Sequence, residues 1–495
     1  MSIRHVLEYL ERTAQSTPER IAFVDEATAF TFGELMQTAQ AIGTAVAGCA
    51  QPRQPVVILM NDRSVHCVAA MLGVLYAGCC YVPLDVSLPK ERLRLIAGSL
   101  QPALVLHDER GEAAEAAFAC SKLSYAQAAS HESCAQQLAA VRAQVMPEDP
   151  MAIMYTSGST GVPKGVVQSM RSHVLYTEAT IVKYGFTQDD VFANQSPFFY
   201  ANSIIDIFPT LALGARTVIL PAKALAFPKL LIGLLNDHRV TELTMTPSSY
   251  VKVAASGVLA PGCLPHLEYI VLSGEAAHWA TLQRWMAAAP AADVWNFYGS
   301  TELYSVAVWP VRGSYDDGQT IPVGPLYDGV ELRLLDDDGR EALPGEPGEM
   351  YLHTPWLADG YYADPERTNE VFFTGDDGKR FYRSGDMGML NAQRQLVVLG
   401  RRDTQIKHMG YRMEIGETER ALLNVEGLDE GCCLYDKASG LLHCFYTGSA
   451  VPKAVSAALK QMLPRYAIPD QFHPLDSMPY TGTMKIDRAE LRKRI

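Results

Sequence analysis

The stretch Met154-Tyr-Thr-Ser-Gly-Ser-Thr-Gly-Val-Pro-Lys-Gly-Val166 predicts a phosphate-binding loop after a short buried strand over 151–155. Small donors, glycines and one lysine after a strand are the usual means of holding a phosphate. The loop supplies four hydroxyls, three glycines that let the backbone approach a ligand, and one mobile charge: Thr156, Ser157, Ser159, Thr160, Gly158, Gly161, Gly165 and Lys164. It is not a Walker loop, because Pro163 and Gly165 flank the lysine. A flexible surface loop is the alternative, and the density of hydroxyls beside one lysine favours phosphate.

Length and composition exclude several classes of protein. A chain of 495 residues is too long for one ordinary core, so two or more domains are expected. The net charge of −13 argues against a general nucleic-acid binder or a polybasic membrane-surface protein. The sequence has no apolar run that could span a bilayer, and its first ten residues predict an amphipathic helix instead of a signal peptide. Ten scattered cysteines without C-x-x-C spacing indicate reduced thiols in a cytoplasmic protein.

Strands and helices alternate along most of the chain, which predicts an α/β fold with parallel or mixed sheets. The expected strands are 55–60, 217–220, 242–246, 267–273 and 294–302, and the expected helices include 65–77 and 227–238. Ligands of such sheets bind beyond the carboxyl ends of the strands. The loop at 154–166, Ser273-Gly274-Glu275 and the turn at 298–302 are therefore expected to converge on one crevice.

The pattern of apolar and polar residues changes near residue 319. Short alternating segments and the turn at 336–339 predict a β-rich subdomain over 318–400. Residues 403–495 are expected to form a separate small α+β domain, with strands near 405–413, 430–436 and 441–447. The predicted organisation is a large N-terminal domain, 1–402, and a small mobile C-terminal domain, 403–495.

Four further motifs follow the glycine-rich loop. They are Tyr298-Gly-Ser-Thr-Glu302, Tyr382-Arg-Ser-Gly-Asp386, Gly400-Arg-Arg-Asp-Thr-Gln-Ile-Lys407 and Gly482-Thr-Met-Lys-Ile-Asp-Arg488. In this order, and over almost the whole chain, they resemble the adenylate-forming enzymes, which include acyl-CoA ligases, luciferases and the adenylation domains of nonribosomal peptide synthesis. The chain departs from the family pattern at Ser300, where proline is usual, at Val398, where the peptide-synthetase type has an aromatic residue, and at Met484, where glycine is usual.

The resemblance implies roles for individual residues. Tyr298 would stack on adenine, Asp386 would accept both ribose hydroxyls, and Arg401 would contact the nucleotide. The catalytic group would comprise Lys485, Thr301 at the α-phosphate, Glu302 and Lys164, with Glu302 also holding Mg²⁺. The other nucleotide-binding residues would be Thr156, Ser157, Gly158, Ser159, Thr160, Gly161, Gly274, Glu275, Gly299 and Ser300. Asp403 would be the hinge on which the small domain turns.

The implied reaction uses ATP and Mg²⁺ to convert a carboxylic acid into an acyl-AMP with release of pyrophosphate. The acyl group would then pass to the phosphopantetheine thiol of a separate carrier protein, or to CoA, as in nonribosomal peptide synthesis and related secondary metabolism. The last motif lies at the end of the chain, so no fused carrier domain is expected. No nucleic-acid or membrane partner is expected.

The pocket for the acid departs from that of amino-acid-activating relatives. Those relatives pair the substrate's α-ammonium with an aspartate, and the matching stretch, Pro197-Phe-Phe-Tyr-Ala-Asn-Ser-Ile-Ile-Asp206, has Ala201 at that position. The other carried-over pocket positions are Asn202, Ile205, Met245, Val271, Ser273, Phe297, Ser305 and Val306. A buried ammonium without a carboxylate is costly, so the substrate is expected to be a keto, hydroxy, aryl or short acyl acid, or an amine held elsewhere. If the register is wrong, Asn202 or Asp206 takes the aspartate's role, although Asp206 is also acidic in ordinary relatives and is interpreted as structural.

Three alternatives stay open. The chain could be an amino-acid–carrier-protein ligase with an unusual pocket, an acyl- or aryl-CoA ligase, or an inactive nucleotide-binding relative. Retention of Lys485, Glu302 and Asp386 argues against the last.

Overall fold

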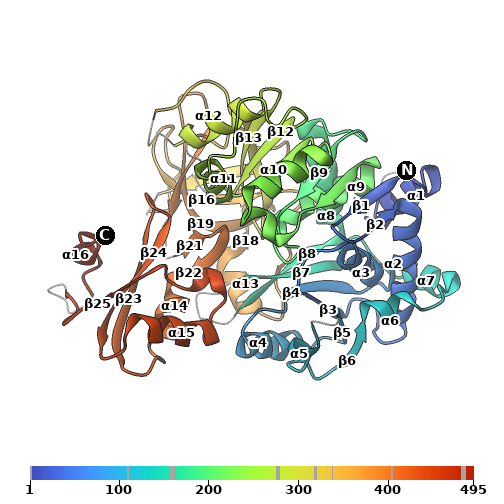
Figure 1. Cartoon of the computed structure of the whole chain (residues 1–495), viewed down its shortest axis with the longest axis horizontal. Helices are drawn as coiled ribbons and strands as arrows, with labels where there is room; N and C mark the ends of the chain where they lie inside the picture. The colour runs from blue at the N-terminus through green and yellow to red at the C-terminus, as the bar shows by residue number, and fades with distance from the viewer. Residues whose placement is uncertain are drawn as a thin grey trace. The chain divides into compact units, whose positions relative to one another are not determined.

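The computed structural model describes residues 3–108, 111–156, 163–274, 279–316, 320–336, 338–402, 405–480 and 486–495. Contacts divide the chain into two units (Figure 1). The first unit comprises Met1–Val86, Leu100–Tyr155 and Gly165–Arg402, and the second comprises Ser87–Ser99, Thr156–Lys164 and Asp403–Ile495. The main division follows Arg402.

An eight-stranded sheet carries most of the motifs. Its strands, in spatial order, are β14 (Tyr304–Pro310), β13 (Asp293–Ser300), β12 (Tyr269–Ser273), β11 (Glu242–Met245), β9 (Val191–Asn194), β10 (Arg216–Ile219), β1 (Ile21–Val24) and β2 (Ala29–Thr31). The strands from β13 to β1 in this order are parallel to their neighbours, and the two edge strands are antiparallel. Apolar residues on successive positions point to opposite faces, so both faces of the sheet are buried.

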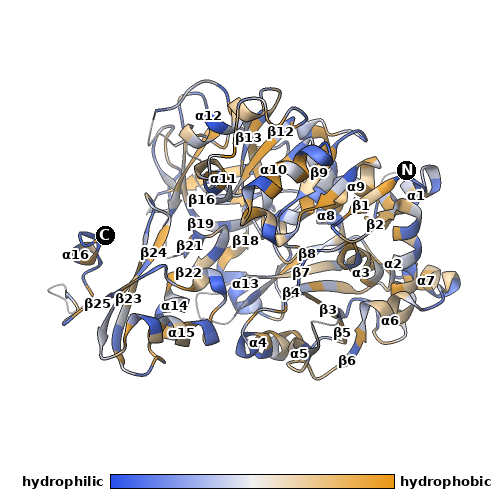
Figure 2. Cartoon of the chain, in the orientation of Figure 1, coloured by the Kyte–Doolittle hydropathy of each residue, from blue (hydrophilic) through white to orange (hydrophobic). Residues whose placement is uncertain are grey.

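Two core clusters cover the two faces of this sheet. In β12, Val271 belongs to one cluster, while Ile270 and Leu272 belong to the other. The Val271 face packs against α8 (Met170–Tyr184) and α9 (Ile204–Leu213). The opposite face packs against α10 (Pro228–Asp237), α11 (Pro247–Ala255) and α12 (Trp279–Ala288). Figure 2 shows the resulting pattern, with hydrophobic strands and helices that are hydrophobic on one side.

A second sheet and the N-terminal helices form the rest of the α/β core. The seven strands are β17 (Gly360–Tyr361), β8 (Lys164–Ser169), β7 (Pro150–Thr156), β4 (Cys80–Asp85), β3 (Pro55–Met60), β5 (Leu104–His107) and β6 (Ser121–Ser124). The helices of this region are α1 (Leu7–Ser16), α2 (Phe32–Ala47), α3 (Val65–Tyr76), α5 (Glu112–Glu115), α6 (Tyr125–Ala129) and α7 (Ala135–Arg142). A capping box between Thr31 and Glu34 begins α2.

An antiparallel sheet forms the expected β-rich subdomain. It contains β15 (Glu331–Leu335), β16 (Gly348–His353), β19 (Arg380–Leu390), β18 (Phe372–Thr374) and β20 (Leu396–Arg401), with α13 (Pro365–Val371) beside it. The short helices η2 (Ala201–Ser203) and η3 (Ala222–Leu225) complete the first unit.

The second unit is a small α+β structure. It contains β21 (Gln405–His408), β22 (Tyr411–Glu414), β23 (Leu428–Asp436), β24 (Leu441–Gly448) and β25 (Gln471–Pro474), with α4 (Lys90–Leu100), α14 (Ile415–Leu422), α15 (Pro452–Met462), η4 (Arg465–Ala467) and α16 (Arg488–Arg492). The buried side chains of Arg92 and Glu417 form an ion pair within this unit. The outer edge of β23 is covered at Cys433, whose N–H donates to Glu419 and whose carbonyl accepts from Arg488.

The α/β class with a small α+β unit is as predicted from the sequence. All ten cysteines carry free thiols. Within the part of the chain that the structure describes, every helix is too short or too polar to cross a bilayer.

Candidate active site

The carboxyl ends of β11, β12 and β13 lie at one edge of the eight-stranded sheet, because the three strands are adjacent and parallel. Ser273 is the register partner of Phe297, so residues 298–300 extend past the end of β12. Gly274 follows β12 with φ 94°, a conformation that favours glycine. The motif at 298–302 therefore occupies the edge at which open α/β sheets bind ligands.

Three motif residues come together beside this edge. The Tyr298 hydroxyl donates to Asp386 Oδ2 at 2.5 Å. Arg401 Nη1 donates to Asp386 Oδ1 at 3.2 Å and to the Ser384 carbonyl at 2.5 Å. Burial and the adjacent Asp386 raise the pKa of Tyr298 well above its ordinary value, so the phenol stays a donor. The carboxylate of Asp386 is thus held in a defined orientation by groups from two other motifs.

Glu302 lies fully buried at the end of the same motif. Its Oε1 accepts a hydrogen bond of 2.9 Å from Tyr361, and the carbonyl of Thr301 accepts one of 2.9 Å from Gln168 Nε2. The described residues contain no group of three or more acidic, histidine or cysteine side chains that could hold a metal. A single carboxylate fits Mg²⁺ that arrives with nucleotide phosphates, because Mg²⁺ is usually bound by one or two carboxylates plus phosphate oxygens.

The backbone is tightly constrained between β13 and β14. A Cβ atom built on Gly299 would lie 1.7 Å from the Tyr304 carbonyl oxygen. Tyr304 itself has φ 58°, which is uncommon for a bulky residue. Its hydroxyl lies 2.9 Å from His173 Nδ1 on α8. Such conformations persist where surrounding contacts impose them, and they cluster at functional sites.

Several predicted residues lie outside the described parts of the chain. They are Ser157, Gly158, Ser159, Thr160, Gly161, Glu275, Asp403 and Lys485. Of the remaining loop residues, Thr156 ends β7 and Lys164 begins β8, and both are half-buried. The roles assigned to all of these residues remain predictions.

Most of the expected acid-pocket residues belong to one region of the first unit. Ala201 and Asn202 lie in η2 and are half-buried. The buried members that share a core cluster with each other are Ile205, Val271, Phe297 and Val306, and Ala201 packs against this cluster. Ser305 is also buried, and Ser273 ends β12.

Met245 does not share the face of the other pocket residues. It belongs to the core cluster on the opposite face of the sheet. Thr244 is the register partner of Val271, so Thr244 is the β11 residue on the Val271 face. If the acid pocket lies on the Val271 face, its β11 residue is Thr244 and not Met245, since a shift of one residue in a strand reverses the side.

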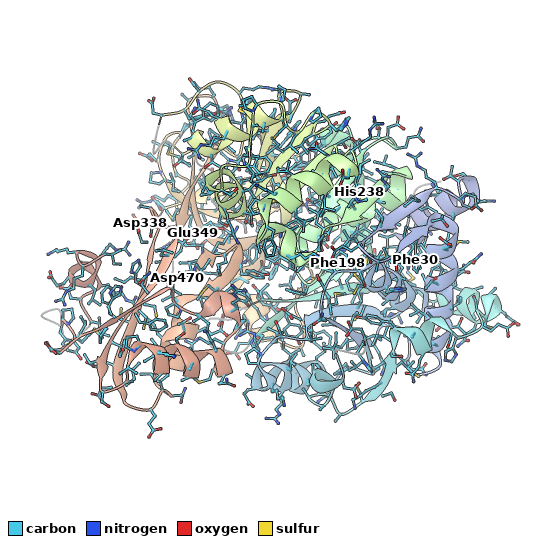
Figure 3. All side chains as sticks on the ribbon, viewed as in Figure 1. Phe30, Phe198, His238, Asp338, Glu349 and Asp470 are labelled. Atoms are coloured by element: carbon cyan, nitrogen blue, oxygen red, sulfur yellow. The ribbon has the colours of Figure 1, made fainter. Side chains whose placement is uncertain are left out.

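Sequence reasoning missed several residues that hold the site in place. Tyr361 and Gln168 bond to Glu302 and Thr301, as described above. Glu349, labelled in Figure 3, is 3% exposed and accepts bonds from Arg383 at 2.8 and 3.0 Å and from Arg402 at 2.9 Å. Burial raises its pKa, but the two arginines outweigh burial and the net shift is downward. These partners have no local sequence signal because they lie far apart along the chain.

The chain is similar to known proteins over nearly its whole length. A family model described as "AMP-binding enzyme" matches residues 10–362. The chain is 30% identical to the D-alanine–D-alanyl carrier protein ligase of Bacillus cytotoxicus, with 99% of each chain covered. It is 29% identical to part of the polyketide synthase PksN of Bacillus subtilis, covering 98% of this chain and spanning 9% of that protein. The Vibrio cholerae adenylation domain AlmE, solved in complex with glycyl-adenosine-5'-phosphate, superposes with a TM-score of 0.86 at 21% identity, covering 100% of this chain and 98% of AlmE.

Proposed function

The chain belongs to the AMP-binding enzyme family, and we propose that it joins a carboxylic acid to the phosphopantetheine thiol of a carrier protein through an acyl-adenylate. The observation that carries this proposal is the hydrogen-bonded group of Tyr298, Asp386 and Arg401, which brings together residues of three of the sequence motifs. The relative named as a D-alanine–D-alanyl carrier protein ligase supports a carrier protein as the acceptor.

The first step is attack of a substrate carboxylate oxygen on the α-phosphorus of ATP. The bond from the α-phosphorus to the bridging oxygen breaks, and pyrophosphate leaves. Asp386 would accept the ribose hydroxyls, and Tyr298 would present its ring to adenine. In the second step the thiol sulfur attacks the acyl carbonyl carbon, the thiol proton is lost to solvent, and AMP leaves.

Charge that develops on phosphorus requires cations and donors that are already in position. Glu302 would hold Mg²⁺, which would neutralise phosphate charge. Lys485 and Thr301 would contact the α-phosphate, and the loop that contains Lys164 would hold the other phosphates. We assign these roles from the motifs and from the buried, Tyr361-bonded position of Glu302.

The acid is proposed not to be an ordinary α-amino acid. Ala201 has no acceptor for an α-ammonium, and an ammonium buried without a partner loses its hydration without compensation. One similar protein has an alanyl group in its name, and another was solved with a glycyl adenylate. An α-amino acid is therefore the alternative substrate that the experiment must exclude.

Pyrophosphate exchange across a panel of carboxylic acids tests the first step. The panel should contain α-amino, α-hydroxy, α-keto, aryl and unsubstituted acids of matched length. We expect exchange with at least one acid that lacks an α-amino group. Strict preference for α-amino acids would contradict the interpretation of Ala201, and no exchange with any acid would contradict the proposed activity.

The acceptor is tested separately, with the acid that gives the fastest exchange. We expect AMP release to depend on a phosphopantetheinylated carrier protein and the product to be a thioester on that protein. Equal or faster consumption of CoA would assign the chain to the acyl-CoA ligases instead.

A further inference from the structure

A buried polar group, here called the acidic cluster, lies where α8 and α9 pack on the eight-stranded sheet. It consists of Asn194, Asp206, Glu242 and Thr244, and none of them has an exposed side chain. Asn194 Nδ2 donates to Asp206 Oδ2 at 2.8 Å, and Thr244 Oγ1 donates to Glu242 Oε1 at 2.5 Å. Two carboxyl groups in one protein interior are costly unless they have partners.

Three acceptor oxygens of the acidic cluster have no hydrogen-bond partner. They are Asn194 Oδ1, Asp206 Oδ1 and Glu242 Oε2. Buried polar atoms in native proteins are nearly always bonded, and a buried acceptor without a donor costs about 1–3 kcal/mol. An ammonium group carries three N–H donors and a positive charge, so it complements three acceptors that include two carboxyl groups.

The acidic cluster adjoins the expected acid pocket along the sheet. Thr244 shares the Val271 face, and Glu242 lies on the same face about 7 Å further from the carboxyl end of β11. Asn194 follows Ala193, the register partner of Leu243, so Asn194 lies beside Thr244 on the same face of the sheet. Asn194 and its partner Asp206 therefore lie next to the Thr244–Glu242 pair.

A positive charge acts on one acid of the acidic cluster, and negative charges act on the other. Arg63 is the cation that acts on Asp206, and its guanidinium already bonds to the carbonyls of Gln195 and Leu220. The negative charges of Asp206 and Asp190 both raise the pKa of Glu242. Burial raises the pKa of both Asp206 and Glu242, as expected for acids without sufficient positive charge nearby.

We propose that the acidic cluster binds an ammonium group of the acid substrate, so that the enzyme selects an acid whose amino group lies several carbons from the carboxyl group. This inference rests on the proposed function. It explains how an amine is held when Ala201 offers no acceptor at the α-position, and it makes Glu242 a specificity-determining residue that the motifs do not reveal.

Matched pairs of substrates test the inference on the wild-type enzyme. Pyrophosphate exchange is measured for glycine, 3-aminopropanoate, 4-aminobutanoate, 5-aminopentanoate and 6-aminohexanoate, each beside the unbranched acid without the amine. We expect one of the longer amino acids to exceed its partner and glycine at least tenfold in kcat/KM. Exchange with other acids but no gain from a distant amine overturns this inference and leaves the proposed function standing. Absence of exchange with every acid overturns both.

Variants then test whether the amino group of the substrate binds at the acidic cluster. Glu242→Gln keeps the shape and removes the charge, so we expect KM for the preferred amino acid to rise tenfold or more while kcat and the amine-free partner change little. Asp293→Asn, at a half-buried acid of β13 that pairs with Arg312, is the control and should keep the preference. A Glu242→Gln enzyme with unchanged amine preference and an unchanged thermal midpoint overturns the assignment of the acidic cluster.

Discussion

At the scale of single residues, burial determines the pKa of His173. The side chain is fully buried, and this lowers its pKa from the ordinary 6.5 to about 4, although the Ser169 carbonyl acts in the opposite direction. Its Nδ1 lies 3.2 Å from that carbonyl, and its ring packs edge-on to Phe208 and Tyr304. Because the folded protein binds this proton less readily than the unfolded chain, His173 stabilises the fold above pH 6.5 and this contribution is lost as pH falls toward 4.

We therefore predict that His173→Gln reduces the acid sensitivity of the fold. Between pH 7.5 and pH 5.0 the histidine accounts for a loss of about 2 kcal/mol in the free energy of unfolding. Urea denaturation at the two pH values should show a smaller fall for the variant than for the wild type by about that amount. Equal falls in the two proteins would show that His173 titrates normally in the fold.

At the scale of secondary-structure elements, the packing of β13 against β14 determines which residue can occupy position 299. The register between the two strands shifts between Tyr298 and Gly299. The shift brings the Gly299 backbone against the Tyr304 carbonyl, and it leaves Tyr298 bonded to Asp386. Glycine is therefore required at 299 by the packing of one strand on the next, and not by its own φ.

Gly299→Ala should consequently damage both stability and activity. Its Cβ would meet backbone at 1.7 Å, so the strands must separate, and we expect a loss of about 2 kcal/mol or more in unfolding free energy. Pyrophosphate exchange should fall at least tenfold because Tyr298 moves with its neighbour. Gly233→Ala, in α10, where nothing lies within 4 Å, should be neutral or stabilising by up to about 1 kcal/mol. Similar behaviour of the two variants would rule out the steric argument.

At the scale of the whole molecule, the first unit ends at a firmly held residue. Arg402 donates to buried Glu349, and its N–H bonds to the Gly385 carbonyl. The chain then enters the second unit at the predicted hinge, Asp403, which lies outside the described residues. An anchored residue directly before a hinge lets one residue absorb the change in φ and ψ that a domain rotation requires.

The two half-reactions should respond oppositely to two variants. Lys485→Ala should abolish acyl-AMP formation, while thioester formation from supplied acyl-AMP largely survives. Asp403→Pro should spare the first half-reaction more than the second, because proline restricts φ at the pivot. Each half-reaction is measured separately, by pyrophosphate exchange and by loading of the carrier protein. Equal loss of both steps in Lys485→Ala, or wild-type transfer in Asp403→Pro, would contradict these roles.

Much of the architecture could be predicted because its signals are local. The strand over 55–60 and the helix over 65–77 match β3 and α3 within one residue, since apolar periodicity is read along a short segment. The β-rich region and the small α+β unit were predicted for the same reason. The face on which Met245 lies could not be predicted, because the side to which a strand residue points depends on register with β12, which lies far along the chain.

The sequence by itself determined the α/β class, the order of the five motifs and, through the match over 10–362, the enzyme family. These follow from residue types and spacings within short segments of the chain. Only the tertiary structure decided that Tyr298 bonds to Asp386, that Thr244 and not Met245 shares the Val271 face of the sheet, and that Asp206 and Glu242 bond to Asn194 and Thr244. Each of these depends on strand register and helix packing between distant segments, where one residue of shift reverses a side chain's face.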